Sequence, residues 1–291
     1  MTVFGTGRAN GGISILHAAG LGKGCSVGLQ LETQVSLVEG PAFAPQDEHR
    51  VLDSVLAVWG EFGYPTPDGT GWRVETEVPV GQGLKSSAAL ACAAARALNE
   101  ASWTGLSDPQ IVDIAVAAQR RSGCTLTGSM DDAWAAISPG WKLVDPEQAS
   151  HDSILLEGDI ETGLSVLIAL RGPRDGRVEP EAFANQSKLF ERALASLSSG
   201  SIFSAMSANG MAVAAATAGD TRWVRPPRPC RPSKLRLLVL AQRSPAESLS
   251  GFMAKHIEQP GSRQSNPAAT NTSWRPSASA WAFTEIGRAH V

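Results

Sequence analysis

The sequence predicts a fold that mixes α-helices with β-strands, and three observations lead to this class. Apolar and polar side chains alternate over residues 26–37 and 72–80, as they do in half-buried strands. At 291 residues the chain is long enough for two compact lobes that share a cleft. Apolar side chains recur with helical spacing in residues 50–62, 88–101, 108–121 and 183–197.

Two further segments complete the expected elements. Leu164–Leu170 is a continuous apolar run of the length of a buried strand. Met206–Ala218 consists mainly of small and apolar residues and predicts one more helix. Beyond Thr221 no such periodicity continues, so the sequence predicts no regular element there.

Composition favours a soluble protein of a reducing compartment. Hydrophobic residues make up 43% of the chain, and no apolar run reaches the ~20 residues that span a bilayer. The first residues lack the basic and apolar regions of a signal peptide, which predicts a cytoplasmic protein. The four cysteines lie far apart in the sequence, which favours free thiols over a disulfide framework or a zinc site.

The last 71 residues differ from the rest in charge and composition. Residues 221–291 hold 11 basic and 3 acidic side chains, a net charge of +8, whereas residues 1–220 carry −11. Arginine alternates with proline over Trp223–Pro232, which disfavours both helix and central strand. A basic nucleic-acid-binding tail and a disordered tail are two interpretations.

We favour a third interpretation, in which the reading frame of the source gene shifts near Thr221. Arginine- and proline-rich sequence is typical of GC-rich coding DNA read out of frame, and Ile286–Val291 matches a translated sequencing adapter. The expected domains are therefore an N-terminal lobe over 1–150, the start of a C-terminal lobe over 151–220, and an aberrant or disordered tail over 221–291. We accordingly predict no nucleic-acid partner and no membrane partner.

One segment has the residues of a phosphate-binding loop. A predicted strand ends at Pro79, Gly81 and Gly83 follow, and Ser86-Ser87 begins an alanine-rich helix. Glycines let the backbone approach a ligand, and the free N–H groups at a helix start favour an anion. Lys85 adds a cation, and the serine hydroxyls can cap the helix or bind Mg²⁺. The alternative is an ordinary capped turn between strand and helix.

The same segment carries a family resemblance. Pro79 to Ala89 resembles the Pro-x-x-x-Gly-Leu-x-Ser-Ser-Ala signature of the galactokinase, homoserine kinase, mevalonate kinase and phosphomevalonate kinase (GHMP) superfamily. Lys85 stands where most members have Gly or Ser, and this variant resembles the archaeal-type shikimate kinases. The resemblance implies that the nucleotide is bound by a set of loop residues, which are Pro79, Gly81, Gly83, Leu84, Lys85, Ser86, Ser87 and Ala88.

Three other segments resemble the same branch in order and spacing. Residues 7–29 contain a glycine-rich loop with Lys23, which by itself is more typical of a hairpin turn. Residues 123–133 are similar to the Thr-x-Thr-Gly-x-x-Asp-Asp-Ala stretch and end on Asp131 and Asp132; such aspartates also occur as simple helix caps. Residues 205–210 resemble a helical Ala-Met-x-x-Asn-Gly element. The resemblance covers residues 1–220, and the third superfamily motif, a glycine-rich loop, is not found after it.

The resemblance implies an α+β fold in two lobes, the first like ribosomal protein S5 domain 2 and the second ferredoxin-like and incomplete. It implies a kinase that uses ATP and Mg²⁺ to convert shikimate to shikimate 3-phosphate in aromatic amino acid biosynthesis. Ser86 and Ser87 would help to hold Mg²⁺. Asp131 or Asp132 would orient or deprotonate the acceptor hydroxyl, and Lys23 would bind substrate or neutralise the transferring group.

Several alternatives stay open at this point. Another kinase of the superfamily, such as homoserine or mevalonate kinase, is the nearest alternative, and an inactive truncated homologue is a further one. His17 is a candidate polar group facing the substrate, although a lone histidine in a loop is usually satisfied locally. Arg171, Arg174 and Arg177 could bind a carboxylate or could form a solvated loop.

Overall fold

The computed structural model describes residues 2–41, 44, 47–160, 164–169, 180–217, 237–240 and 289–290. Arg171, Arg174, Arg177 and most of the expected tail lie outside the described residues. The helices are α1 Ala18–Leu21, α2 Val51–Glu61, α3 Ser86–Ser102, α4 Asp108–Ser122, α5 Asp131–Ile137, α6 Pro180–Ala184, α7 Ser187–Ser198 and α8 Ile202–Ala216. The strands are β1 Val3–Leu16, β2 Gly24–Glu39, β3 Thr70–Thr76, β4 Trp141–Val144, β5 Ile154–Gly158, β6 Ser165–Ala169, β7 Leu237–Leu240 and β8 Ala289–His290.

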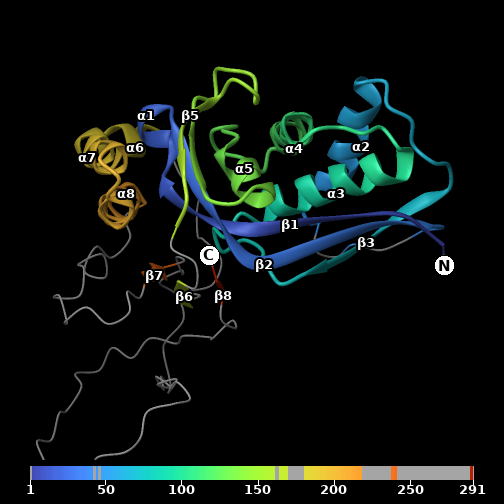
Figure 1. Ribbon diagram of the computed structural model, residues 1–291, viewed down its shortest axis with the longest axis horizontal. Coiled ribbons are helices and arrows are strands. Elements are labelled where there is room, and N and C mark those ends of the chain that lie inside the picture. Colours follow the sequence, from blue (N-terminus) through green and yellow to red (C-terminus); the bar gives the residue numbers. More distant parts are fainter. Residues whose placement is uncertain are drawn as a thin grey trace, which may run out of the picture.

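An antiparallel sheet of five strands is built around β2 (Figure 1). β1 pairs with β2 along most of its length, and Ser14 lies directly opposite Ser26. On its other edge β2 pairs with β4 through residues 24–27 and with β3 through residues 33–39. β5 pairs with β4 in this same sheet, so the sheet extends past residue 150, the expected end of the N-terminal lobe.

Helices α2 to α5 cover one face of this sheet (Figure 1). α3 lies against β1 at very short range because both surfaces carry small residues. A Cβ atom on Gly7 would come within 2.0 Å of the Ala93 carbonyl oxygen, and one on Gly5 within 2.3 Å of the Ala97 carbonyl oxygen. The glycines of β1 therefore set the position of α3, whose first residues follow the predicted phosphate loop.

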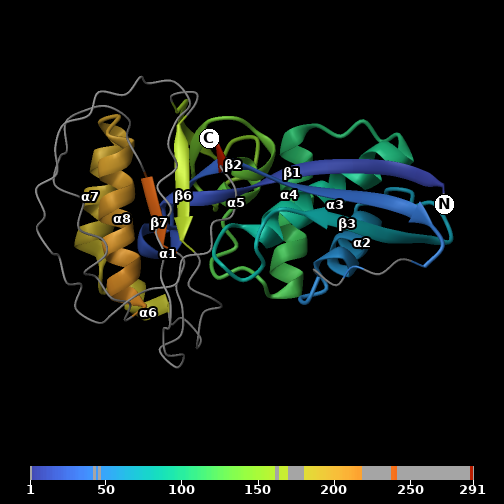
Figure 2. The same ribbon diagram turned by 90° about the horizontal axis from the view of Figure 1, so that it is seen from below.

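The second part of the described chain contains α6, α7 and α8 together with β6 to β8. These three helices lie at the end of the molecule opposite the N-terminus, next to α1 (Figures 1 and 2). β6 pairs in parallel with β7 and antiparallel with β8. A buried apolar cluster joins this part to the sheet, because Phe183, Phe190 and Ala205 pack with Ile13 and Val27.

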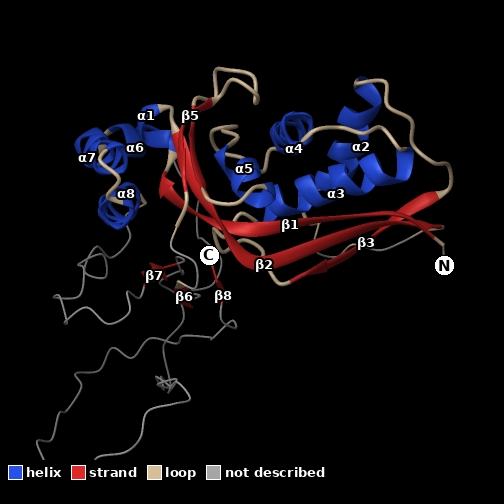
Figure 3. Ribbon diagram, viewed as in Figure 1, coloured by secondary structure: helices blue, strands red, loops and turns tan. Residues whose placement is uncertain are grey.

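The α+β class predicted from the sequence is confirmed, and Figure 3 shows the separate sheets and helices. Several element boundaries differ from the prediction, three of them by more than two residues. β3 ends at Thr76 instead of Pro79, because the Val78 N–H donates to Thr76 Oγ1 and Pro79 has no N–H group to donate to a neighbouring strand. The helix expected over 183–197 is two helices, α6 and α7, and α8 begins at Ile202 rather than Met206. Two short strands, β7 and β8, occur in the tail, where the sequence predicted none.

Candidate active site

The predicted phosphate loop connects β3 to the start of α3. Gly81 and Gly83 have φ angles of 71° and 77°, a backbone region that side chains other than glycine rarely adopt. Both are exposed, and a Cβ atom on either would meet no described atom within 4 Å. These glycines are therefore required by the path of the backbone, and the loop surface stays open to a ligand.

The end of this loop is fixed to β1. Leu84 is buried, and its carbonyl oxygen accepts a hydrogen bond from the Gly12 N–H at 3.0 Å. Lys85 follows in the left-handed region, with φ 64° and ψ 30°, and is the residue before the first turn of α3. Such a conformation costs a non-glycine residue on the order of 1–3 kcal/mol and persists only when its surroundings impose it.

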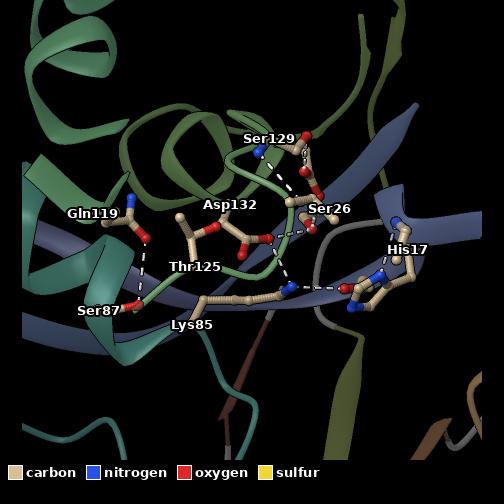
Figure 4. A network of polar contacts seen from close by, with 12 residues as sticks. His17, Ser26, Lys85, Ser87, Gln119, Thr125, Ser129 and Asp132 are labelled. Atoms are coloured by element: carbon tan, nitrogen blue, oxygen red, sulfur yellow. Dashed lines mark hydrogen bonds and ion pairs between the residues drawn. The ribbon is translucent and has the colours of Figure 1, made fainter. Parts of the chain in front are cut away.

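The ammonium group of Lys85 lies between a serine of β1 and an aspartate of α5 (Figure 4). Its Nζ donates to Ser14 Oγ at 2.7 Å and lies 2.6 Å from Asp132 Oδ1. The side chains of Lys85 and Asp132 are 13% and 31% exposed, so this ion pair is partly shielded from water. The structure thus joins the phosphate loop and the Asp-Asp motif, which lie 46 residues apart in the sequence.

The two adjacent aspartates have different surroundings. Asp131 is 4% exposed, and its two carboxylate oxygens accept hydrogen bonds from Ser26 Oγ and Ser129 Oγ, each at 2.6 Å. Asp132 is the more exposed of the two and faces Lys85. Ser26 Oγ also lies 3.1 Å from Asp132 Oδ1, so one hydroxyl contacts both carboxylates.

These surroundings separate the pKa values of the two aspartates. Burial, followed by the negative charge of Asp132, raises the pKa of Asp131 to about 6, against the opposing effects of Lys85, Ser129 and Ser26. Burial acts in the same direction on Asp132, but the charge and hydrogen bond of Lys85, with smaller effects of His17 and Ser26, outweigh it and lower its pKa. Asp132 is therefore ionised at neutral pH, and Asp131 takes up a proton in mildly acidic solution.

The space around Asp131 depends on Gly24. A Cβ atom on this residue would lie 2.2 Å from Asp131 Oδ1 and 2.7 Å from Ser129 Oγ. The neighbouring Cys25 is buried, and burial together with the charge of Asp131 raises the pKa of its thiol far above the usual range. Cys25 is thus a protonated core residue, as expected from the sequence.

The turn before α5 is held by α4. Arg120 donates two hydrogen bonds to the Gly128 carbonyl oxygen, from Nε at 3.2 Å and from Nη2 at 2.6 Å. The Gly128 N–H in turn donates to Thr125 Oγ1 at 3.0 Å. Gly128 has a φ of 65°, and a Cβ atom there would lie 2.5 Å from Arg120 Nε. The guanidinium therefore fixes the turn from which Asp131 and Asp132 follow.

Two more polar groups surround this network. Ser87 Oγ donates to Oε1 of Gln119, a buried amide on α4, at 3.3 Å (Figure 4). On the opposite side, the His17 backbone N–H donates to Asn209 Oδ1 of α8 at 2.8 Å, and the His17 ring stacks on Phe183 at 4.9 Å. Nδ1 of His17 accepts from the Ala19 N–H, so a proton on the neutral ring resides on Nε2.

A pocket opens beside the first residues of α3. Its walls combine apolar side chains with hydroxyl, carboxylate and imidazole groups, and are formed by Thr33, Asp47, Glu48, His49, Val51, Val74, Thr76, Val80, Ser86, Ser87 and Leu90. Asp47 accepts hydrogen bonds from the first N–H groups of α2, those of Val51 at 2.6 Å and Leu52 at 2.9 Å. The pocket adjoins the predicted phosphate loop, since Val80, Ser86 and Ser87 are among its lining residues.

The predicted site residues are partly brought together. Lys85 and Asp132 are in contact, whereas the other predicted cation, Lys23, pairs with Asp145 at 3.5 Å. Ser14, Ser26, Ser129 and Gln119 were not predicted, because an isolated serine or glutamine has no recognisable spacing. Among the described residues no cluster of three His, Cys, Asp or Glu side chains could hold a metal ion, and no helix has the length and apolar character needed to cross a membrane.

The N-terminal part of the chain is similar to known proteins. Residues 49–140 match the family described as the GHMP kinases N terminal domain. The chain is 33% identical over 177 residues to a shikimate kinase of Pyrococcus abyssi, a match that covers 57% of this chain and 63% of the relative. It is 28% identical over 207 residues to a shikimate kinase of Thermoplasma acidophilum, which covers 70% and 72% of the two chains.

The matches to the first relatives are partial. This chain spans 63%, 55% and 50% of the length of three archaeal shikimate kinases that it resembles at 32–33% identity. Among solved structures, the mevalonate kinase of Methanococcus jannaschii has a TM-score of 0.54 at 11% identity and covers 72% of this chain and 78% of that one. A likeness at this identity shows a shared fold.

Proposed function

We propose that this chain, whose residues 49–140 match the GHMP kinases N terminal domain, transfers the γ-phosphoryl group of ATP to a hydroxyl of shikimate, giving shikimate 3-phosphate and ADP. The shikimate kinases of archaea, at about 30% identity, support this choice of acceptor. The observation on which the proposal depends is the contact of Lys85 with Asp132. It brings a cation of the phosphate loop and a carboxylate within 2.6 Å of each other.

The proposed reaction relies on position and charge more than on strong base catalysis. The attacking hydroxyl must lie in line with the γ-phosphoryl group, and Asp132 can accept its hydrogen bond. Because Lys85 keeps the pKa of Asp132 low, this carboxylate is a weak base. A loose phosphoryl-transfer transition state needs proton removal only late, so an orienting carboxylate is sufficient. The hydroxyl proton then leaves through Asp132 to solvent as the new P–O bond forms and ADP departs.

The remaining loop residues would bind the nucleotide. Gly81, Gly83 and the first N–H groups of α3 suit the phosphates, since the helix dipole favours negative charge at this end. The neighbouring pocket, with apolar walls from Val51, Val74 and Leu90, suits the base and the ribose.

The donor atoms of the residues at this site have the chemistry that Mg²⁺ requires. Mg²⁺ prefers oxygen ligands and usually takes only one or two from the protein together with phosphate oxygens. The hydroxyls of Ser86 and Ser87 and the amide oxygen of Gln119 supply such donors at the start of α3. When bound, Mg²⁺ would neutralise phosphate charge.

The test is an assay of ADP release with ATP, Mg²⁺ and one of shikimate, homoserine or mevalonate. We expect turnover with shikimate and with neither of the other two acceptors. We expect Asp132→Asn to lower kcat by ~10²-fold or more with KM for ATP little changed. Both the 291-residue chain and a chain with the frame corrected near Thr221 are measured. Turnover with homoserine or mevalonate, but not shikimate, would contradict the assigned acceptor.

A further inference from the structure

The hydroxyl of Ser26 connects the two aspartates, and its geometry has a chemical consequence. A serine hydroxyl has one proton to donate and two lone pairs to accept hydrogen bonds. Ser26 Oγ lies 2.6 Å from Asp131 Oδ2 and 3.1 Å from Asp132 Oδ1, so it can donate to only one carboxylate at a time. Ser26 is 1% exposed, so its hydroxyl is largely shielded from solvent.

We propose that Ser26 is a positioning residue that couples Asp131 to Asp132 by directing its single proton to one or the other; this rests on the proposed role of Asp132. While Asp131 is ionised, Ser26 donates to it, which matches the shorter of the two distances. Asp132 Oδ1 then depends on Lys85 alone for its hydrogen bond within this network.

When Asp131 gains a proton, the direction of donation reverses. The neutral carboxyl donates its own proton to Ser26 Oγ, and the Ser26 hydroxyl turns to donate to Asp132 Oδ1. Ser26 keeps its one hydroxyl proton throughout this change, and the added proton stays on Asp131. Asp132 then accepts from both Ser26 and Lys85, and it accepts a hydrogen bond from the substrate hydroxyl less well.

The register of the sheet explains why Ser26 can do this. Ser26 lies opposite Ser14 in the pairing of β1 with β2, and opposite side chains of a strand pair lie on one face. Ser14 contacts the ammonium group of Lys85, while Ser26 contacts the two carboxylates. One cross-strand pair of serines therefore holds the cation and the anions of the site.

Other ionisable groups face these aspartates and enter the test. Lys85 acts on both carboxylates, and His17 acts on Asp132. In turn, the charge of Asp131 acts on the thiol of Cys25, and the charge of Asp132 acts on the thiol of Cys92 of α3. Burial raises the pKa of both thiols, that of Cys92 to about 12, so neither thiol titrates near neutrality. Because the charge of His17 also acts on Asp132, the ¹³C titration of the carboxyl carbons accompanies the pH profile.

The experiment uses the full 291-residue chain and three variants. Ser26→Ala removes the shared hydroxyl, and Asp131→Asn removes the titrating group. Ser36→Ala is the matched control, because Ser36 is another serine of β2 that is 1% exposed, but it contacts Thr6 instead of the aspartates. The pH dependence of kcat with shikimate is measured together with the ¹³C titration of the aspartate carboxyl carbons, which requires no turnover.

We expect Ser26→Ala to move the ¹³C midpoint of Asp131 upward by about one pH unit, because ionised Asp131 loses a hydrogen bond. The acidic fall of kcat that follows Asp131 protonation should disappear in this variant, because the hydroxyl that turns to Asp132 is gone. We expect kcat at neutral pH to change by less than about threefold, since Ser26 donates to Asp131 there and not to Asp132, and Ser36→Ala to match the wild type. In Asp131→Asn the acidic midpoint assigned to Asp131 should disappear.

An unchanged ¹³C midpoint and pH profile in Ser26→Ala would overturn the coupling and leave the proposed kinase activity intact. If Ser26→Ala does not fold, an acidic midpoint that persists in Asp131→Asn overturns the coupling instead. If the wild type shows no shikimate-dependent ADP release, the proposed function fails, and the ¹³C titration still decides whether Ser26 joins the two carboxylates.

Discussion

Replacing Gly24 with alanine perturbs the carboxylate pair without removing any polar group. The new methyl carbon would lie 2.2 Å from Asp131 Oδ1 and 2.5 Å from its Cγ, whereas an ordinary contact needs 3.4 Å or more. The Asp131 side chain or β2 must therefore move by roughly 1.2 Å, the difference between these two distances. A shift of that size is enough to lengthen the 2.6 Å contact with Ser26 or with Ser129 beyond hydrogen-bonding range.

Both activity and stability should respond to this change. Overpacking of a closely packed site costs about 1–3 kcal/mol of folding free energy. A misplacement of about 1 Å in a site that works by orientation lowers kcat by roughly 10²-fold. We therefore expect Gly24→Ala to fold with lower stability in urea unfolding and to lose about two orders of magnitude in shikimate-dependent kcat.

The matched control for this variant is Gly60→Ala on α2. A Cβ atom on Gly60 would meet no described atom within 4 Å, and its φ is not positive. Alanine is the better helix former, so this control should be neutral or gain up to about 1 kcal/mol of stability. Wild-type kcat and wild-type stability in Gly24→Ala would refute the close contact between Gly24 and Asp131.

Three other predictions follow from the same network. Lys85→Met removes the main charge that keeps Asp132 ionised, so it should raise the pKa of Asp132 and lower kcat by ~10²-fold or more. The pKa is measured by ¹³C titration, and an unchanged value would contradict the ion pair. The pKa of Asp131 is about 6 in the folded chain and near 3.8 when unfolded, so the folded state binds more protons between these values. The stability due to Asp131 is therefore greatest below pH 4 and falls as pH rises through 6. Asp131→Asn should abolish this loss, which is on the order of 3 kcal/mol when urea unfolding at pH 4 is compared with pH 7; parallel pH profiles of the two proteins would speak against it. Arg120→Ala should lower kcat about tenfold with KM for ATP little changed, because the Gly128 carbonyl loses both of its guanidinium donors. Arg120→Lys should recover part of the loss. Equal activity of the wild type and both variants would show that the turn before α5 keeps its conformation without Arg120.

Local features of the sequence were sufficient to predict the conformation of the glycine-containing loop before α3. The loop, its glycines and the start of α3 are neighbours in the chain, and their requirements are local: positive φ at Gly81 and Gly83, and a helix start at Ser86. The helix periods were also readable, since an apolar stripe depends only on residues within a few turns. Domain ends were harder to read, because β5 joins the first sheet through pairing with a strand ten residues earlier.

The roles within the aspartate pair could not be read in the same way. Asp131 and Asp132 have the same chemistry and are adjacent, so the sequence left the choice between them open. The tertiary structure separates them by what lies opposite each one: a buried pair of serines around Asp131, and the Lys85 ammonium group at Asp132. The pKa difference follows from burial and charge, which are properties of the fold.

The sequence by itself determined the α+β class, the glycine-containing loop before α3 and the adjacent aspartates at the start of α5, because each depends on residue type and short spacing. Only the tertiary structure decided that Lys85 turns toward Asp132, and that Ser14 and Ser26 hold the cation and the anions. Those contacts depend on strand register between β1 and β2 and on the left-handed backbone of Lys85. Register is set by the packing of the whole sheet, so no local stretch of sequence specifies it.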